Sequence, residues 1–224
     1  MQVSKINIGA EMAQALARVL RKPYQVRRAL AALGLTEDIV RGIAMAAGAA
    51  RASTIDVDPA GTPGQMSYIY GVRQIRLDLL PLGWRKARFN NVESTVNDEL
   101  GVQLVFQNVD VACTAKDPEA ISGKGAASRQ LVANGTADMF DDAAVFSKSK
   151  HGSTPRVWLF CFSSGPNGVS AEISCPDSFE GNQFQGFSER IWVVDQDGSP
   201  SAEPRKDTGP DDDDLDLDVV ISRK

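Results

Sequence analysis

Five cations near the front of the chain are the residues best suited to bind a charged ligand. They fall within one short stretch, and they are Arg18, Arg21, Lys22, Arg27 and Arg28. Lysine and arginine side chains neutralise phosphates, so a group of this kind could contact a nucleic-acid backbone. The alternative is that the five residues form the solvated face of a helix.

A second set mixes aromatic and cationic residues between Gly83 and Asn91. Its members are Trp84, Arg85, Lys86, Arg88 and Phe89. Base stacking combined with phosphate neutralisation is how proteins bind single-stranded or flipped bases. The alternative, which the residue types favour for the two rings, is a pair of core anchors with the cations outside. Trp84, Arg85, Lys86 and Arg88 are therefore candidate nucleic-acid contacts with a structural alternative.

Carboxylates around the second predicted strand are the best candidates for metal chemistry. They are Glu93, Asp98, Glu99 and Asp110. A nuclease that binds Mg²⁺ needs converging carboxylates, usually with a lysine at short spacing, and no such lysine follows Asp110. His151 is the only histidine, so zinc motifs and histidine-based nucleophilic catalysis have little to draw on. We expect no catalytic residue, metal or cofactor.

Charge is sorted along the chain. Residues 1–51 carry eight Lys/Arg against three Asp/Glu, a net of +5, whereas residues 195–224 carry four against ten, a net of −6. The acidic end contains a candidate partner-binding segment made of Asp211, Asp212, Asp213, Asp214, Leu215 and Leu217. Its charge run passes into an alternating apolar pattern, which could add a strand to a sheet edge or lie in a basic groove. The alternative is a solubilising tail.

The elements that would position these residues begin with helices. Apolar spacings predict a first helix over Gly9 to Arg21, a second from Pro23 to a stop at Gly34, and a third that Thr36 caps. The stretch Val26 to Ile43 resembles a helix-turn-helix, although an ordinary three-helix packing unit is favoured. Residues 1–51 are thus predicted to be a helical unit, and Ala52 to Gln65 reads as a linker.

Beyond this linker the sequence predicts a sheet. Strands are expected around Ile75 to Leu79, over Val102 to Val111, and over Phe187 to Val194. The clearest hairpin joins an all-apolar strand, Val157 to Phe162, to Val169 to Cys175, whose intervening polar residues predict one solvated face. Two weak helices are expected near 126–132 and 138–146. The fold class is α+β, with a mostly antiparallel sheet domain over 66–194 and a disordered acidic tail over 195–224.

Three classes of function follow from these features. The favoured one is a non-enzymatic binding or regulatory protein of a nucleic-acid-associated assembly, with nucleic acid and a protein partner for the tail as its ligands. The second is a metal-dependent nuclease or related phosphodiesterase, and the third is an assembly subunit that docks through its tail. The three cysteines read as buried hydrophobic residues. Without an apolar run of membrane length or a signal-peptide pattern, we expect a soluble, cytoplasmic protein with no membrane contact.

Overall fold

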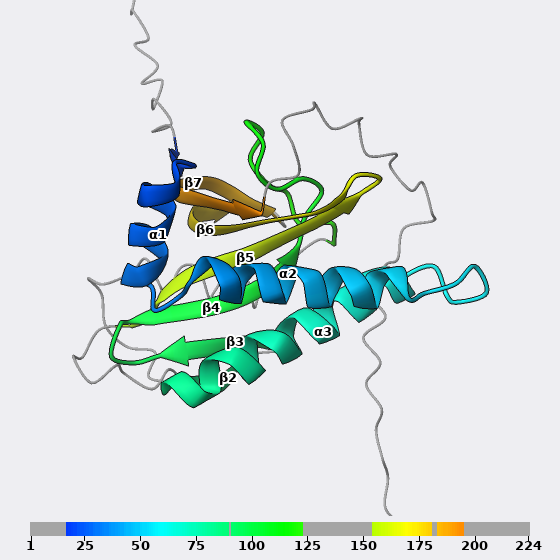
Figure 1. The fold of residues 1–224 in the computed structure, drawn as a ribbon, viewed down its shortest axis with the longest axis horizontal. Helices are drawn as coiled ribbons and strands as arrows, with labels where there is room; N and C mark the ends of the chain where they lie inside the picture. Colours follow the sequence, from blue (N-terminus) through cyan, green and yellow to red (C-terminus); the bar gives the residue numbers. More distant parts are fainter. Residues whose placement is uncertain (1–16, 90, 123–153, 181–182, 195–224) are drawn as a thin grey trace, which may run out of the picture.

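The computed structural model describes residues 17–89, 91–122, 154–180 and 183–194. In this part of the chain, three helices lie against one seven-stranded mixed sheet (Figure 1). The predicted α+β fold class is confirmed. The sheet contains more strands than the five that the sequence predicts.

The described helices are α1 (Pro23–Ala32), α2 (Glu37–Ala52) and α3 (Thr62–Leu79), and a 3-10 turn over Leu80–Leu82 follows α3. The strands are β1 (Arg18–Leu20), β2 (Arg85–Phe89), β3 (Val92–Asn97), β4 (Val102–Asn108), β5 (Arg156–Gly165), β6 (Gly168–Glu180) and β7 (Gln183–Val194). Their order across the sheet is β1-β7-β6-β5-β4-β3-β2. The β1/β7 and β4/β5 pairs are parallel and the other four pairs are antiparallel, as the mostly antiparallel prediction requires.

Strand β5 is the centre of the sheet and is buried on both faces. Trp158, Phe160 and Phe162 join the cluster beneath the helices, whereas Leu159 and Cys161 join a smaller cluster on the opposite face. This alternation is what a strand covered on two sides requires. The predicted hairpin is confirmed, since β5 and β6 pair in antiparallel register from Leu159/Ser174 to Gly165/Gly168.

The turn between α1 and α2 follows the predicted signals. Gly34 adopts φ 69°, a left-handed conformation that ends α1, and a β-carbon there would lie 2.7 Å from Leu100 Cδ1. Thr36 caps α2, because its hydroxyl oxygen accepts a hydrogen bond from the Ile39 N–H at 3.2 Å. Glycine and threonine thus fix the direction in which α2 leaves the turn.

Two predicted elements are wrong. The first helix cannot reach Arg21, because Arg18–Leu20 forms β1 and pairs with Glu189–Ile191 of β7. Ile75 and Leu79 belong to α3 rather than to a strand, and Leu77 between them is 62% exposed. A spacing of four residues satisfies both a two-residue and a helical period, so the alternation was ambiguous.

The remaining differences concern the predicted linker, the segments outside the described residues and two strands. The predicted linker, Ala52 to Gln65, includes the last residue of α2, a turn over residues 53–61 and the start of α3 at Thr62. The weak helices at 126–132 and 138–146 and the tail at 195–224 lie outside the described residues. Strands β2 and β3 were not predicted as strands.

We expect Phe160→Ala to lower the free energy of unfolding by about 3–5 kcal/mol. Phe160 is fully buried and its ring stacks on Phe106 at 5.4 Å, so its loss leaves a cavity under the helices. A urea titration of the two proteins measures the difference. A loss below about 1 kcal/mol would contradict the placement of β5 in the core.

Candidate nucleic-acid interface

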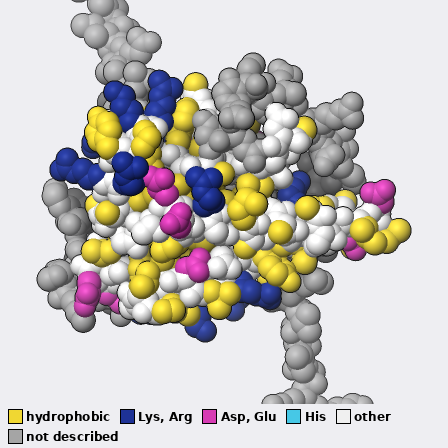
Figure 2. Space-filling model, viewed as in Figure 1, with side chains coloured by type: hydrophobic (Ala, Val, Ile, Leu, Met, Phe, Trp, Pro, Cys, Tyr) yellow, Lys and Arg dark blue, Asp and Glu magenta, His cyan; other side chains and the backbone are white. Residues whose placement is uncertain are grey.

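The five front-end cations lie together on the surface of β1, α1 and the turn between them. We call this set, Arg18, Arg21, Lys22, Arg27 and Arg28, the α1 basic surface. All five are exposed. Figure 2 shows Lys and Arg side chains gathered over the α1 end of the molecule. The sequence grouping therefore corresponds to a grouping in space.

Members of the α1 basic surface differ in how strongly they are already paired. Arg18 contacts Glu189 at 3.3 Å, and Arg27 approaches Glu37 at 3.9 Å, both at exposed positions. Arg21, Lys22 and Arg28 form no ion pair with any residue that the structure describes. Within the described residues, these three cations differ in this respect from Arg18 and Arg27.

Tyr24 stands among these cations and was not singled out from the sequence. Its side chain is 61% exposed, and it lies one helical turn before Arg28 on the surface of α1. Residues four apart on a helix are surface neighbours. The signal that could have found Tyr24 was an aromatic residue flanked by cations on both sides in the sequence.

The second predicted set is arranged differently. Trp84 is only 4% exposed, and it packs beside the α1–α2 turn, since a β-carbon on Gly34 would lie 3.6 Å from its Cζ2. The structure therefore places this ring in the core, as the structural alternative expected, rather than on a surface where a base could stack.

The cations of the second set lie on β2, an edge strand of the sheet. Arg85 donates two hydrogen bonds to Asp98, at 2.6 and 2.8 Å, and these bonds raise the pKa of Arg85 despite its partial burial. Arg88 contacts Glu93 at 3.4 Å. Lys86 is exposed and has no ion pair with a described residue. Charged side chains of this kind protect an edge strand from pairing with another sheet.

The candidate metal-binding carboxylates do not converge. Glu93 pairs with Arg76 and Arg88, Asp98 pairs with Arg85, and the Asp110 carboxylate contacts Lys116 at 2.6 Å. Among the described residues, no group of three or more His, Cys, Asp or Glu side chains is arranged to hold a metal ion. Glu93, Asp98 and Asp110 are each paired with a cation of the protein.

The stretch Val26 to Ile43, which resembles a helix-turn-helix in sequence, packs its helices against the sheet in the structure. Val40, Ile43, Ala44 and Ala47 are buried beneath α2 in the same cluster as the sheet. The exposed side of this helix carries Asp38 near its start, where DNA phosphates would meet a negative charge. A recognition helix needs the opposite charge on that side.

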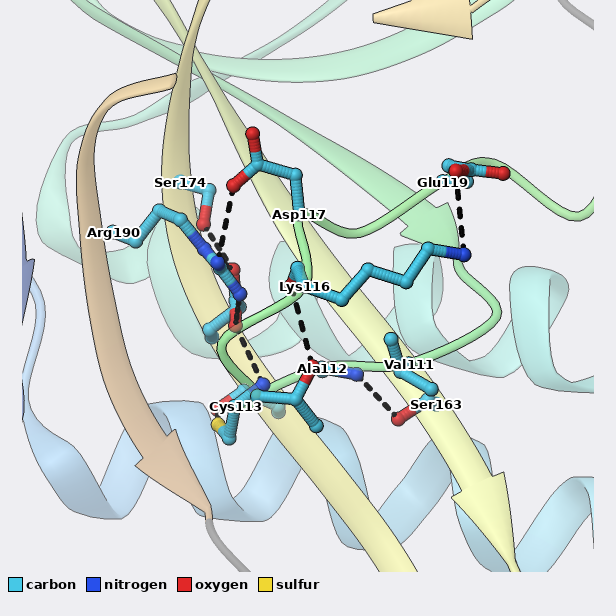
Figure 3. A network of polar contacts seen from close by, with 12 residues as sticks. Val111, Ala112, Cys113, Lys116, Asp117, Glu119, Ser163, Ser174 and Arg190 are labelled. Carbon is cyan, nitrogen blue, oxygen red and sulfur yellow. Dashed lines mark hydrogen bonds and ion pairs between the residues drawn. The ribbon is translucent and has the colours of Figure 1, made fainter. Parts of the chain in front are cut away.

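A buried ion pair on the opposite face of the sheet is the feature that the sequence analysis missed. Glu172 on β6 and Arg190 on β7 are diagonal neighbours on the paired strands and are 0% and 1% exposed. Arg190 Nε and Nη2 donate to the two oxygens of Glu172, each at 2.8 Å. Ser174 donates to the same carboxylate at 2.7 Å, and Asp117 accepts from Arg190 Nη1 at 3.2 Å (Figure 3).

This network ties the segment after β4 to the sheet. The Cys113 N–H donates to Glu172 at 2.6 Å, and the Ala112 N–H donates to Ser163 at 3.0 Å (Figure 3). The prediction of a solvated face on β6 is therefore wrong, because this segment covers Glu172 and Ser174. Their polar groups form hydrogen bonds with each other, with the Cys113 N–H and with the Arg190 guanidinium rather than with water.

Burial and the charge of Glu172 act in opposite directions on the pKa of Arg190 and in the same direction on the pKa of Cys161. Burial alone lowers the pKa of Arg190, but the hydrogen bonds and negative charge of Glu172 raise it overall, so this guanidinium stays protonated. Burial raises the pKa of the Cys161 thiol well above its usual value, and the Glu172 charge adds to that increase. Cys161, like Cys113 and Cys175, is buried, as predicted. A protonated, buried thiol is a poor nucleophile.

Comparisons of the chain with protein-family models, with curated proteins and with solved structures find no match. No helix within the described ranges combines the length and the apolar character that a membrane crossing requires. The predicted partner segment, Asp211 to Leu217, lies outside the described residues and stays a prediction.

We expect Arg190→Met to lower the free energy of unfolding by about 3–5 kcal/mol, because Glu172 would remain buried without its counter-charge. The double variant Glu172→Leu/Arg190→Met should lose less than Arg190→Met alone. Urea titrations of the double variant and of the single variants Arg190→Met and Glu172→Leu measure this difference. If the double variant loses as much as the sum of the two single variants, the two charges are not coupled.

Proposed function

We propose that this protein is a non-enzymatic binding or regulatory protein of a nucleic-acid-associated assembly, and that it contacts nucleic acid through the α1 basic surface. The observation that carries the proposal is the exposure of Arg21, Lys22 and Arg28 without a counter-charge among the described residues. Binding a phosphate at such cations releases counterions and does not require breaking an existing ion pair.

Competing assignments have less support. A nuclease would need carboxylates free to hold a metal, whereas Glu93, Asp98 and Asp110 each contact a cation of the protein. Binding through β2 would require Arg85 and Arg88 to leave Asp98 and Glu93. The α1 basic surface meets neither obstacle.

Replacing Arg21 and Arg28 by alanine should weaken binding to all nucleic-acid sequences alike. Each lost phosphate contact should reduce the slope of log affinity against log salt concentration by about 0.7 for a single strand and about 0.9 for a duplex. Fluorescence anisotropy with labelled oligonucleotides over a salt series measures both quantities.

The matched control is the double variant Arg73→Ala/Lys86→Ala, which removes the same net charge from α3 and β2. Both residues are exposed. We expect the control to retain most of the affinity and salt dependence. Equal losses in the two double variants would mean that overall charge, rather than the α1 basic surface, governs binding.

The second candidate function is that of an assembly subunit formed with a second copy of this chain. Five of the six exposed residues of α2, all except Arg41, recur at alternating spacings of four and three, and they are Asp38, Gly42, Met45, Ala49 and Ala52. This spacing is that of a coiled-coil seam. In an antiparallel pair centred on Met45, which is 59% exposed, Asp38 of one copy would face the end of α2 that carries Arg51 in the other.

For this second candidate, sedimentation velocity should detect a dimer of the 24.1 kDa chain, and Met45→Glu should convert it to a monomer. Two buried carboxylates at the centre of the pair would repel each other. Arg73→Glu, on the neighbouring helix α3, is the control and should leave the dimer intact. A wild-type protein that stays monomeric at about 100 μM, a concentration at which weak homodimers form, would remove this candidate.

A further inference from the structure

We infer that the nucleic acid bound at the α1 basic surface is single-stranded, and that Tyr24 is the residue on which one of its bases stacks. The inference rests on the proposed function and adds the class of nucleic acid and the residue that selects it. It follows from the surroundings of the tyrosine ring, which differ from those of every other described aromatic residue.

Tyr24 and Tyr70 are the two described aromatic residues classed as exposed. The Tyr70 ring, 36% exposed, is covered by the Arg73 guanidinium at 4.4 Å from the ring centroid. The Tyr24 ring, 61% exposed, has no ring or cation contact with any described residue. An uncovered aromatic face at the surface leaves apolar area in water, which a stacked base would bury.

The cations around Tyr24 are placed to hold the strand on both sides of that base. Arg21 and Lys22 precede the ring in the chain, and Arg28 follows it by one helical turn, about 5.4 Å along the axis. Phosphates on either side of a stacked base would therefore find a cation that has no other described partner. Stacking combined with phosphate contacts is the general mode of single-strand binding.

A duplex could use only part of this surface. Its bases are stacked on one another inside the helix, so their faces are not available to a surface tyrosine. The phosphates of a duplex would still attract the cations. The geometry thus predicts that strand and duplex share the electrostatic contribution to binding, and that only the strand gains from Tyr24.

The test measures anisotropy of a labelled 15-nucleotide oligothymidine strand and of a labelled 15-base-pair duplex at low salt, with the full chain. Tyr24→Ala should weaken binding of the strand by about tenfold, the size expected for loss of one stacked base. Its affinity for the duplex should change by less than about twofold. Tyr24→Phe keeps the ring and should bind the strand as the wild type does.

Two controls separate stacking from other effects. Tyr70→Ala removes the other exposed tyrosine and should leave both affinities unchanged. The salt dependence should not change in Tyr24→Ala, because stacking releases no counterions, whereas Arg28→Ala should reduce the single-strand slope by about 0.7. Circular dichroism of Tyr24→Ala should match the wild type, since an exposed side chain contributes little to folding.

The outcomes distinguish the two proposals. If neither oligonucleotide binds the wild-type protein at low salt, the proposed function fails. If both bind and Tyr24→Ala weakens neither, or weakens both equally, the proposed function stands and the single-strand inference is overturned. A selective loss of strand binding that Tyr24→Phe does not share supports the inference.

Discussion

The helical layer is fixed to the sheet where α3 passes over Phe106 with no side chain between them. A β-carbon on Gly71 would lie 2.2 Å from the Phe106 ring, so the helix backbone rests directly on it. Phe106 in turn stacks on Phe160 at 15° between planes, which joins β4 to the central strand. Helix α2 packs along α3, and α1 connects to α2 through the turn at Gly34. The α1 basic surface is also held directly on the sheet, because β1 pairs with β7 and α1 packs against β7.

The two faces of the sheet are covered by different physical means. Apolar helix surfaces bury the first face, whereas the second is closed by a backbone segment whose polar groups need partners. Glu172 supplies an acceptor for the Cys113 N–H, and Arg190 neutralises the carboxylate. The pair is costly to desolvate, so its effect is to fix where the segment lies rather than to add much stability. Cys113, at φ 58°, keeps an unusual left-handed backbone within this arrangement.

Local signals in the sequence predicted the elements whose pattern is local. The β5/β6 hairpin and the turn from Gly34 to Thr36 are confirmed, since turn residues and caps act within a few positions. Strand β1 was missed because it has only three residues, and their strand conformation depends on pairing with β7, far along the chain. For the same reason Glu172 reads as a solvated strand residue until the covering segment is known. In the candidate interface, the cation group and the burial of Trp84 as a core anchor could be predicted, but the pairing of Arg85 with Asp98 could not.

The pattern of ion pairs explains how a chain with a net charge of −5 presents a basic surface. Carboxylates of the sheet and its loops are matched to local cations, as Asp98 is to Arg85 and Asp110 is to Lys116. Around α1, no described carboxylate forms an ion pair with Arg21 or Arg28, so no described residue neutralises their charge at close range. Screening shortens the range of the remaining negative charge to about 8–10 Å at physiological salt, so distant carboxylates would have little effect on a phosphate that the proposed function places there. The proposed function therefore depends on the local arrangement of charge rather than on its sum.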